Sequence, residues 1–136
     1  MTLKKLGQMA HVTEAVYLSE FQKVQPILER EAKLRREIAQ LQMQSKEGSQ
    51  HLQNDQSMQS VGADLLWQAW LARTHRQLNM ELSQVVAKKM TAMDKLRKAF
   101  GRKTAVATML ENQQQERLKD RNKKAFDRMM QVQLPR

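Results

Sequence analysis

The chain has 136 residues, a net charge of +10 and no cysteine, and good helix formers outnumber the aromatic, glycine and proline residues that compact domains normally carry. The absence of cysteine excludes a disulfide framework and thiolate zinc sites, and no stretch approaches the roughly 20 apolar residues that cross a membrane. The N-terminal segment MTLKKLGQMAHV has no continuous apolar run, so we expect no secretory signal and a soluble, intracellular protein.

The first predicted element is a helix over about residues 9–44. Its inward positions follow one another at alternating intervals of three and four, and they are Val24, Ile27, Glu31, Leu34, Ile38 and Leu41. All but Glu31 are apolar, and this heptad pattern is typical of a helix that wraps around another helix. Pro26 interrupts the segment, and because the apolar pattern continues across it, we expect a kink there.

A polar turn is predicted over about residues 45–62, which read SKEGSQHLQNDQSMQSVG. The alternative that part of this segment is frayed helix stays open, because glutamine is not a helix breaker. A second helix is predicted over about residues 63–130, where the positions that recur every seven residues are Leu71, Leu78, Val85, Ala92, Ala99 and Val106. Leu82, Leu96, Leu110 and Leu118 complete this stripe. We therefore expect one all-α domain over residues 1–136, an elongated antiparallel two-helix coiled-coil hairpin with unequal arms. Such a seam can be filled by the same chain or by another, and a monomer is favoured.

The positive charge is concentrated in the second half of the chain. Residues 1–60 hold eight basic and seven acidic residues, a net charge of +1, whereas residues 61–136 hold sixteen and seven, a net charge of +9. This asymmetry indicates an anionic partner, namely nucleic acid, an acidic membrane or an acidic protein surface, or else serves solubility alone.

The segment KLRKAFGRKT, residues 95–104, superficially resembles a phosphate-binding loop. A Walker loop needs a glycine where Leu96 stands and a lysine where Arg102 stands, and it must follow a strand. We expect Gly101 to lie inside a helix instead, at a cost of roughly 1 kcal/mol relative to alanine. It is a possible hinge, a point where a partner approaches closely, or a small residue tolerated on the packed face.

The sequence offers no catalytic, cofactor-binding or metal-binding residues. His11, His51 and His75 lie far apart and lack neighbours of the kind that bind metals. The acidic residues alternate with lysine and arginine, as on solvated helix faces, and no Ser-His-Asp or Cys-His pattern occurs. We therefore expect a protein that is not an enzyme.

Two features remain that favour binding. Trp67 and Trp70, in LLWQAWLA, are spaced to share a helix face, where they either close the hairpin core beside the turn or anchor a partner. Basic residues cluster over residues 88–103 and 117–128. Nucleic-acid binding is reasonable on charge alone, but no helix-turn-helix, zinc finger or aromatic RNA platform accompanies the clusters.

This organisation resembles the FliJ/YscO family, the coiled-coil stalk proteins of flagellar and type III secretion export machines. The likeness lies mainly in the second arm, QLNMELSQVVAKKMTAMDKLRKAFGRKTAVATMLENQQQERLKDRNKKAFDRMM, with its GRKTAV…LE stretch at residues 101–111. The tryptophan pair and Pro26 are not assigned to the family pattern. The resemblance implies a cytoplasmic protein, peripheral at the cytoplasmic face of the inner membrane, that docks in the hexameric export ATPase and contacts the membrane export gate and export chaperones.

The resemblance also implies where the partners would bind. The end that holds both termini would meet the ATPase, and the candidate contacts are Leu3, Lys4, Lys5, Arg117, Lys119, Arg121, Lys124 and Arg128. The end near the turn, with Trp67 and Trp70, would be free for the gate. Two alternatives stay open: a basic coiled coil that binds nucleic acid, and a scaffold that self-associates through Val86, Met93 and Phe100.

Overall fold

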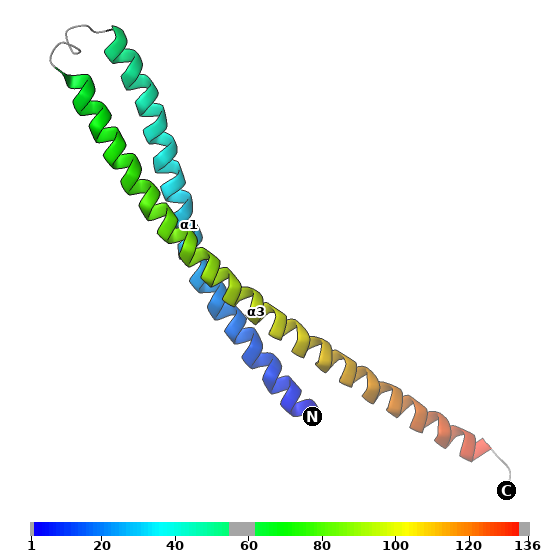
Figure 1. Cartoon of the computed structure of the whole chain (residues 1–136). Coiled ribbons are helices and arrows are strands. Elements are labelled where there is room, and N and C mark those ends of the chain that lie inside the picture. The colour runs from blue at the N-terminus through cyan, green and yellow to red at the C-terminus, as the bar shows by residue number, and fades with distance from the viewer. Residues whose placement is uncertain (1, 55–61, 134–136) are drawn as a thin grey trace. The chain divides into compact units, whose positions relative to one another are not determined.

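The computed structural model describes residues 2–54 and 62–133, and within these ranges it contains two long α-helices and no strand. Helix α1 (Leu3–Asn54) has 52 residues and helix α3 (Ala63–Gln133) has 71, so the arms are unequal (Figure 1). Gly48 lies against Trp67, whereas Glu31, earlier in α1, lies against Lys89, later in α3. The two helices therefore run antiparallel, and the predicted all-α helical hairpin is confirmed.

Helix α1 is longer than predicted at both ends. Thr2 caps its start, because the Thr2 hydroxyl accepts a hydrogen bond of 3.2 Å from the backbone N–H of Lys5. At the other end residues 45–54 are helical, although they were assigned to the polar turn. Glutamine, lysine and glutamate are good helix formers, so their polarity alone does not end a helix. The rest of the predicted turn, residues 55–61, lies outside the described residues.

Helix α1 continues through Pro26, as the apolar pattern on either side of it indicates. The Pro26 ring is exposed, so it displaces no side chain from the packed face. The kink expected at this position stays a prediction.

The described residues form two units, which we name the hairpin unit (Gln22–Asp94) and the terminal unit (Met1–Phe21 with Lys95–Arg136). In the hairpin unit the side chains of Val24, Leu34 and Leu41 are buried, as the heptad spacing predicts. Ile27 and Ile38 are half-buried at the positions between them. The seam of this unit is thus a single apolar line along α1 that faces α3.

An ion pair interrupts the apolar seam of the hairpin unit. Lys89 Nζ lies 3.1 and 2.9 Å from the two carboxylate oxygens of Glu31, whose side chain is only 13% exposed. Arg35 Nε lies 3.8 Å from the same carboxylate, and Arg30 pairs with Glu81 at 3.1 Å in a more exposed position. Because a half-buried carboxylate requires a cation opposite it, the Glu31–Lys89 pair fixes the register of the two helices.

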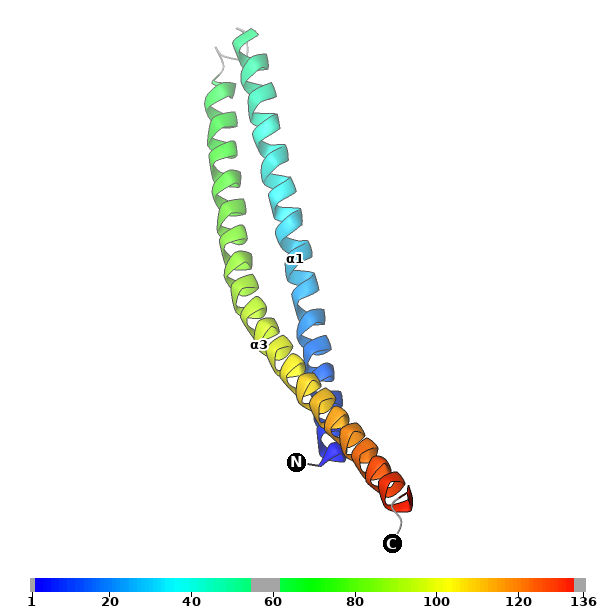
Figure 2. The same cartoon turned by 90° about the vertical axis from the view of Figure 1, so that its right-hand side faces the viewer.

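The terminal unit is packed along only part of α3. Leu6, Ala99 and Val106 are buried, and Gln113 is the last half-buried residue of α3. Helix α3 continues past the start of α1 (Figure 2). Every described residue from 114 to 133 is exposed. Leu118 was expected to extend the apolar stripe of the seam, but its side chain is 58% exposed. That expectation is wrong because Leu118 follows Gln113 by five residues, which places its side chain off the line of the seam.

The Glu31–Lys89 pair gives the first testable prediction. We expect Lys89→Met to lower the free energy of unfolding by about 1–3 kcal/mol, because it leaves the Glu31 carboxylate in the seam with only the distant Arg35. Urea denaturation followed by circular dichroism measures this change. Arg30→Met, which breaks the exposed pair with Glu81, is the control and should cost at most about 1 kcal/mol. Equal losses in the two variants would contradict a special role for the seam pair.

Candidate interaction surfaces

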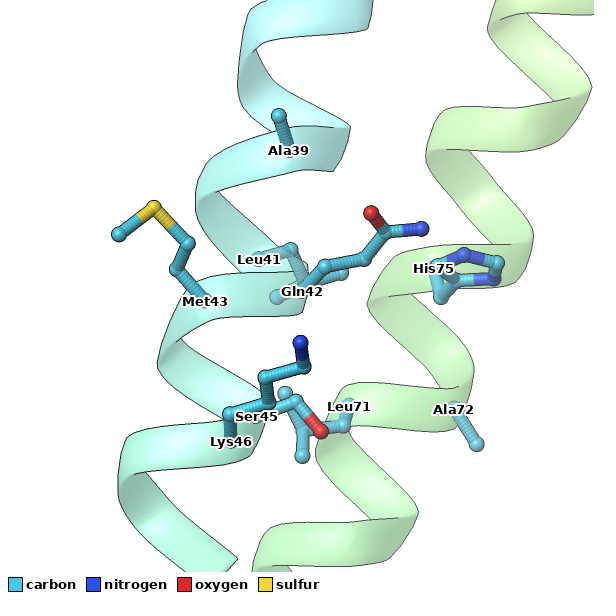
Figure 3. A pocket seen from close by; sticks show the side chains of 9 residues that line it. All are labelled: Ala39, Leu41, Gln42, Met43, Ser45, Lys46, Leu71, Ala72 and His75. Atoms are coloured by element: carbon cyan, nitrogen blue, oxygen red, sulfur yellow. The ribbon is translucent and has the colours of Figure 1, made fainter.

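The hairpin unit has a shallow depression, which we consider first as a candidate catalytic site. It lies between α1 and α3, and its lining residues are Ala39, Leu41, Gln42, Met43, Ser45, Lys46, Leu71, Ala72 and His75 (Figure 3). Gln42 extends toward His75, whose Nδ1 lies 3.0 Å from the side-chain nitrogen of Asn79. The lining holds no carboxylate to act with the imidazole, so it offers no acid–base pair.

Metal-binding geometry is not found among residues 2–54 and 62–133, where no group of three or more His, Asp or Glu side chains converges. The expectation that this protein is not an enzyme stays a prediction. The surfaces described next are therefore considered as binding surfaces.

The tryptophan pair divides into one packed and one exposed ring. The rings of Trp67 and Trp70 stack with centroids 5.2 Å apart. Trp67 is half-buried against Gly48, and its buried Nε1 has no hydrogen-bond partner among the described residues. Trp70 is 41% exposed. Trp67 is thus packed in the hairpin core, which was one of the two predicted roles. Trp70 instead presents apolar area that a partner could cover, which was the other role.

Three aromatic rings from two helices meet in the terminal unit. Tyr17 lies 6.2 Å from Phe21 and 5.8 Å from Phe100, measured between ring centroids. Lys103 Nζ lies 4.6 Å from the centre of the Tyr17 ring, within the range of a cation–π contact. Phe100 remains 53% exposed, and we name these three rings the aromatic cluster. No local motif predicted it, because its members come from two helices; heptad pairing of Tyr17 with Phe100 is the signal that could have found it.

Gly101 lies within α3 on an exposed face, and a Cβ added there would meet no atom within 4 Å. The idea that it is a small residue on the packed face is therefore wrong. The packed positions of this turn are instead Ala99 and Lys103. Gly101 as a hinge stays a prediction.

The exposed end of α3 carries most of the predicted partner-binding cations. Arg117, Arg121, Lys124 and Arg128, which we name the cationic row, follow one another at intervals of four, three and four. Arg117 and Lys124 follow Leu110 at intervals of seven, so these two members of the row continue the line of the seam, on which Asp120 and Asp127 also lie. Among the described residues, no carboxylate forms an ion pair with any member of the row.

The remaining predicted cations lie near the same end. Lys119 is exposed on a different face of α3 from the cationic row. Lys4 and Lys5 are exposed in the first turn of α1, which belongs to the same terminal unit as the cationic row. Leu3 is half-buried beside them. The terminal unit thus gathers the candidate ATPase contacts, while Trp67 and Trp70 belong to the hairpin unit.

Comparison of the chain with protein-family models, with curated proteins and with solved structures finds no match. Neither α1 nor α3, over the described residues, contains a stretch long and apolar enough to cross a membrane. The resemblance to export stalk proteins therefore stays a prediction.

Gly48 in α1 and Gly101 in α3 give a matched pair of predictions. A methyl group at position 48 would lie 2.5 Å from Trp67 Nε1, so Gly48→Ala must displace the indole and should lower the free energy of unfolding by about 1–3 kcal/mol. Gly101→Ala meets open space and should raise it by up to about 1 kcal/mol. Thermal unfolding of both variants tests this, and a stabilising Gly48→Ala would contradict the close packing of Trp67. A stabilised Gly101→Ala protein with full function would remove the hinge.

Proposed function

We propose that this chain is a non-enzymatic stalk protein of a flagellar or type III secretion export apparatus. In this role it docks in a hexameric export ATPase and links that ATPase to the membrane export gate, with export chaperones as further partners. The observation that carries the proposal is the end of α3, where residues 114–133 form a helix that no other described residue covers and that places cations on the line of the seam.

This arrangement suits insertion into a ring. A helix that continues past its partner is narrower than the two-helix seam, so it can enter a narrow opening. The cationic row would face acidic inner loops of the ring, which would steer the helix during association and hold it at low salt. The association should weaken as ionic strength rises, because the exposed charges are screened.

The proposed contact with the gate belongs to the hairpin unit. Trp70 offers an exposed ring that is held in place by stacking on Trp67. A rigid aromatic side chain loses little conformational entropy when it is covered, which is why tryptophan is frequent among binding hot spots. We assign Trp70 to the contact with the gate and Trp67 to its support.

The ATPase contact is tested by charge reversal in the cationic row. Arg121→Glu with Lys124→Glu should weaken binding to a purified hexameric flagellar-type export ATPase by about tenfold or more, because two attractive charges become repulsive. Binding and ATP hydrolysis are followed in the same sample at several salt concentrations. The matched control is Arg36→Glu with Arg73→Glu, which makes the same change of charge in the hairpin unit. Equal weakening by both pairs would contradict a specific site in the row.

A nucleic-acid-binding function is the second candidate, and the aromatic cluster favours it. Exposed rings beside cations form the kind of surface on which single-stranded bases stack. In the terminal unit Phe100 and Phe21 are exposed, and Arg97 and Arg102 are exposed on the same helix as Phe100.

Phe100→Ala separates this function from simple charge attraction. We expect it to weaken binding to a single-stranded RNA by about 1–3 kcal/mol if bases stack on the cluster, with the salt dependence unchanged. Fluorescence anisotropy measures both quantities, and Met109→Ala is the control because it removes another exposed apolar side chain of the same helix. Unchanged affinity of the Phe100→Ala protein would exclude the stacking platform.

A further inference from the structure

The exposed end of α3 has a second face beside the cationic row. Its apolar side chains Leu118, Ala125, Met129 and Val132, which we name the apolar stripe, recur at intervals of seven, four and three. Leu118, Met129 and Val132 are 58%, 60% and 86% exposed. The stripe does not lie on the line of the seam, so a longer α1 would not have covered it. Its exposure is therefore a property of α3 itself.

The charges of residues 114–133 are sorted around this stripe. At about 100° per residue, the cationic row borders the apolar stripe on one side, while on the other side Asn122, Gln115 and Gln133 separate the stripe from Phe126 and Lys119. The three acidic residues of the segment, Glu116, Asp120 and Asp127, gather within about 40° of one another on the opposite face. The helix thus presents an apolar stripe bordered by cations on one side and turns its carboxylates away.

We propose that residues 114–133 bind the surface of an anionic lipid bilayer, with the helix lying in the plane of the interface. The apolar stripe would enter the boundary between headgroups and acyl chains, and Phe126 would enter beside it. The cationic row and Lys119 would contact lipid phosphates on the two sides, because their long side chains reach from the apolar face to the headgroups. The acidic residues would face water.

The combination of features favours a bilayer over the other anionic partners. A nucleic acid needs the cations but has no use for an exposed apolar stripe along the helix. A bilayer interface uses both, since it has phosphate and hydrocarbon at adjacent depths. Neither α1 nor α3 is suited to cross a membrane over its described residues, so the contact would be peripheral.

Binding to lipid involves no ATPase, so this inference stands apart from the proposed function. Both use the cationic row, but only lipid binding uses the apolar stripe. A vesicle and the ATPase should therefore compete for the protein, and substitutions in the stripe should affect the vesicle alone.

The test is co-sedimentation of the full chain with vesicles of equal parts phosphatidylglycerol and phosphatidylcholine, compared with phosphatidylcholine alone. We expect binding to the anionic vesicles only. Leu118→Ser with Met129→Ser should weaken it by about tenfold or more, and Arg121→Gln with Arg128→Gln should do the same. The matched controls change exposed side chains of the hairpin unit, Met43→Ser with Met90→Ser and Arg36→Gln with Arg73→Gln, and should retain binding.

Circular dichroism of each variant tests whether a loss of binding reflects a loss of helix. We expect the helix content to be unchanged, because the substituted side chains are exposed. Equal binding to neutral and anionic vesicles would overturn the inference. So would binding that the serine pair leaves unchanged, since that result would mark a purely electrostatic surface of the kind that a nucleic acid or an acidic protein contacts.

Discussion

The fold depends on the burial of one narrow line of side chains between two antiparallel helices. A helix as long as α3 is not stable through its own hydrogen bonds alone, and tertiary contact along one face supplies most of its stability. Here that contact consists of small and medium apolar residues such as Leu34 and Ala99, together with the Glu31–Lys89 pair. The apolar residues allow many registers, whereas a charge pair inside the seam allows few. Packing and specificity are thus contributed by different residues of the same line.

The exposed surfaces of this protein are a consequence of its narrow seam. Because a two-helix seam covers only a strip of each helix, aromatic and apolar side chains outside the strip remain exposed, as Phe100 and Trp70 do. In a layered domain the same residues would be buried and would carry no information about partners. The end of α3 is the extreme case, because residues 114–133 lack even the seam contact. Its side chains are exposed along the whole segment.

The sequence predicted the helices and the seam well because both depend on local periodicity. Val24, Leu34 and Leu41 are buried at the expected spacing, and α3 starts at Ala63 as expected. The predicted end of α1 is about ten residues too early, because the polar residues after Gln44 indicated a turn. In the structure these residues are helical to Asn54, and Gly48 packs against Trp67. The aromatic cluster was missed for a different reason. It requires the pairing register between helices, which no single-helix pattern supplies. The prediction for Leu118 fails because this residue follows Leu110 by eight residues and so leaves the seven-residue repeat.

The cationic row and the apolar stripe lie side by side on one exposed helix, and they suit different kinds of partner. Arg117 and Lys124 lie on the line of the seam, so a protein that extends the coiled-coil geometry meets these two cations together with Asp120 and Asp127. The apolar stripe is rotated away from that line, so a ligand that needs hydrocarbon contact must approach from another direction. A single helix cannot present both faces fully to two rigid partners at once. Apolar substitutions on residues 114–133 therefore report on lipid binding alone, whereas charge substitutions in the cationic row affect both binding events.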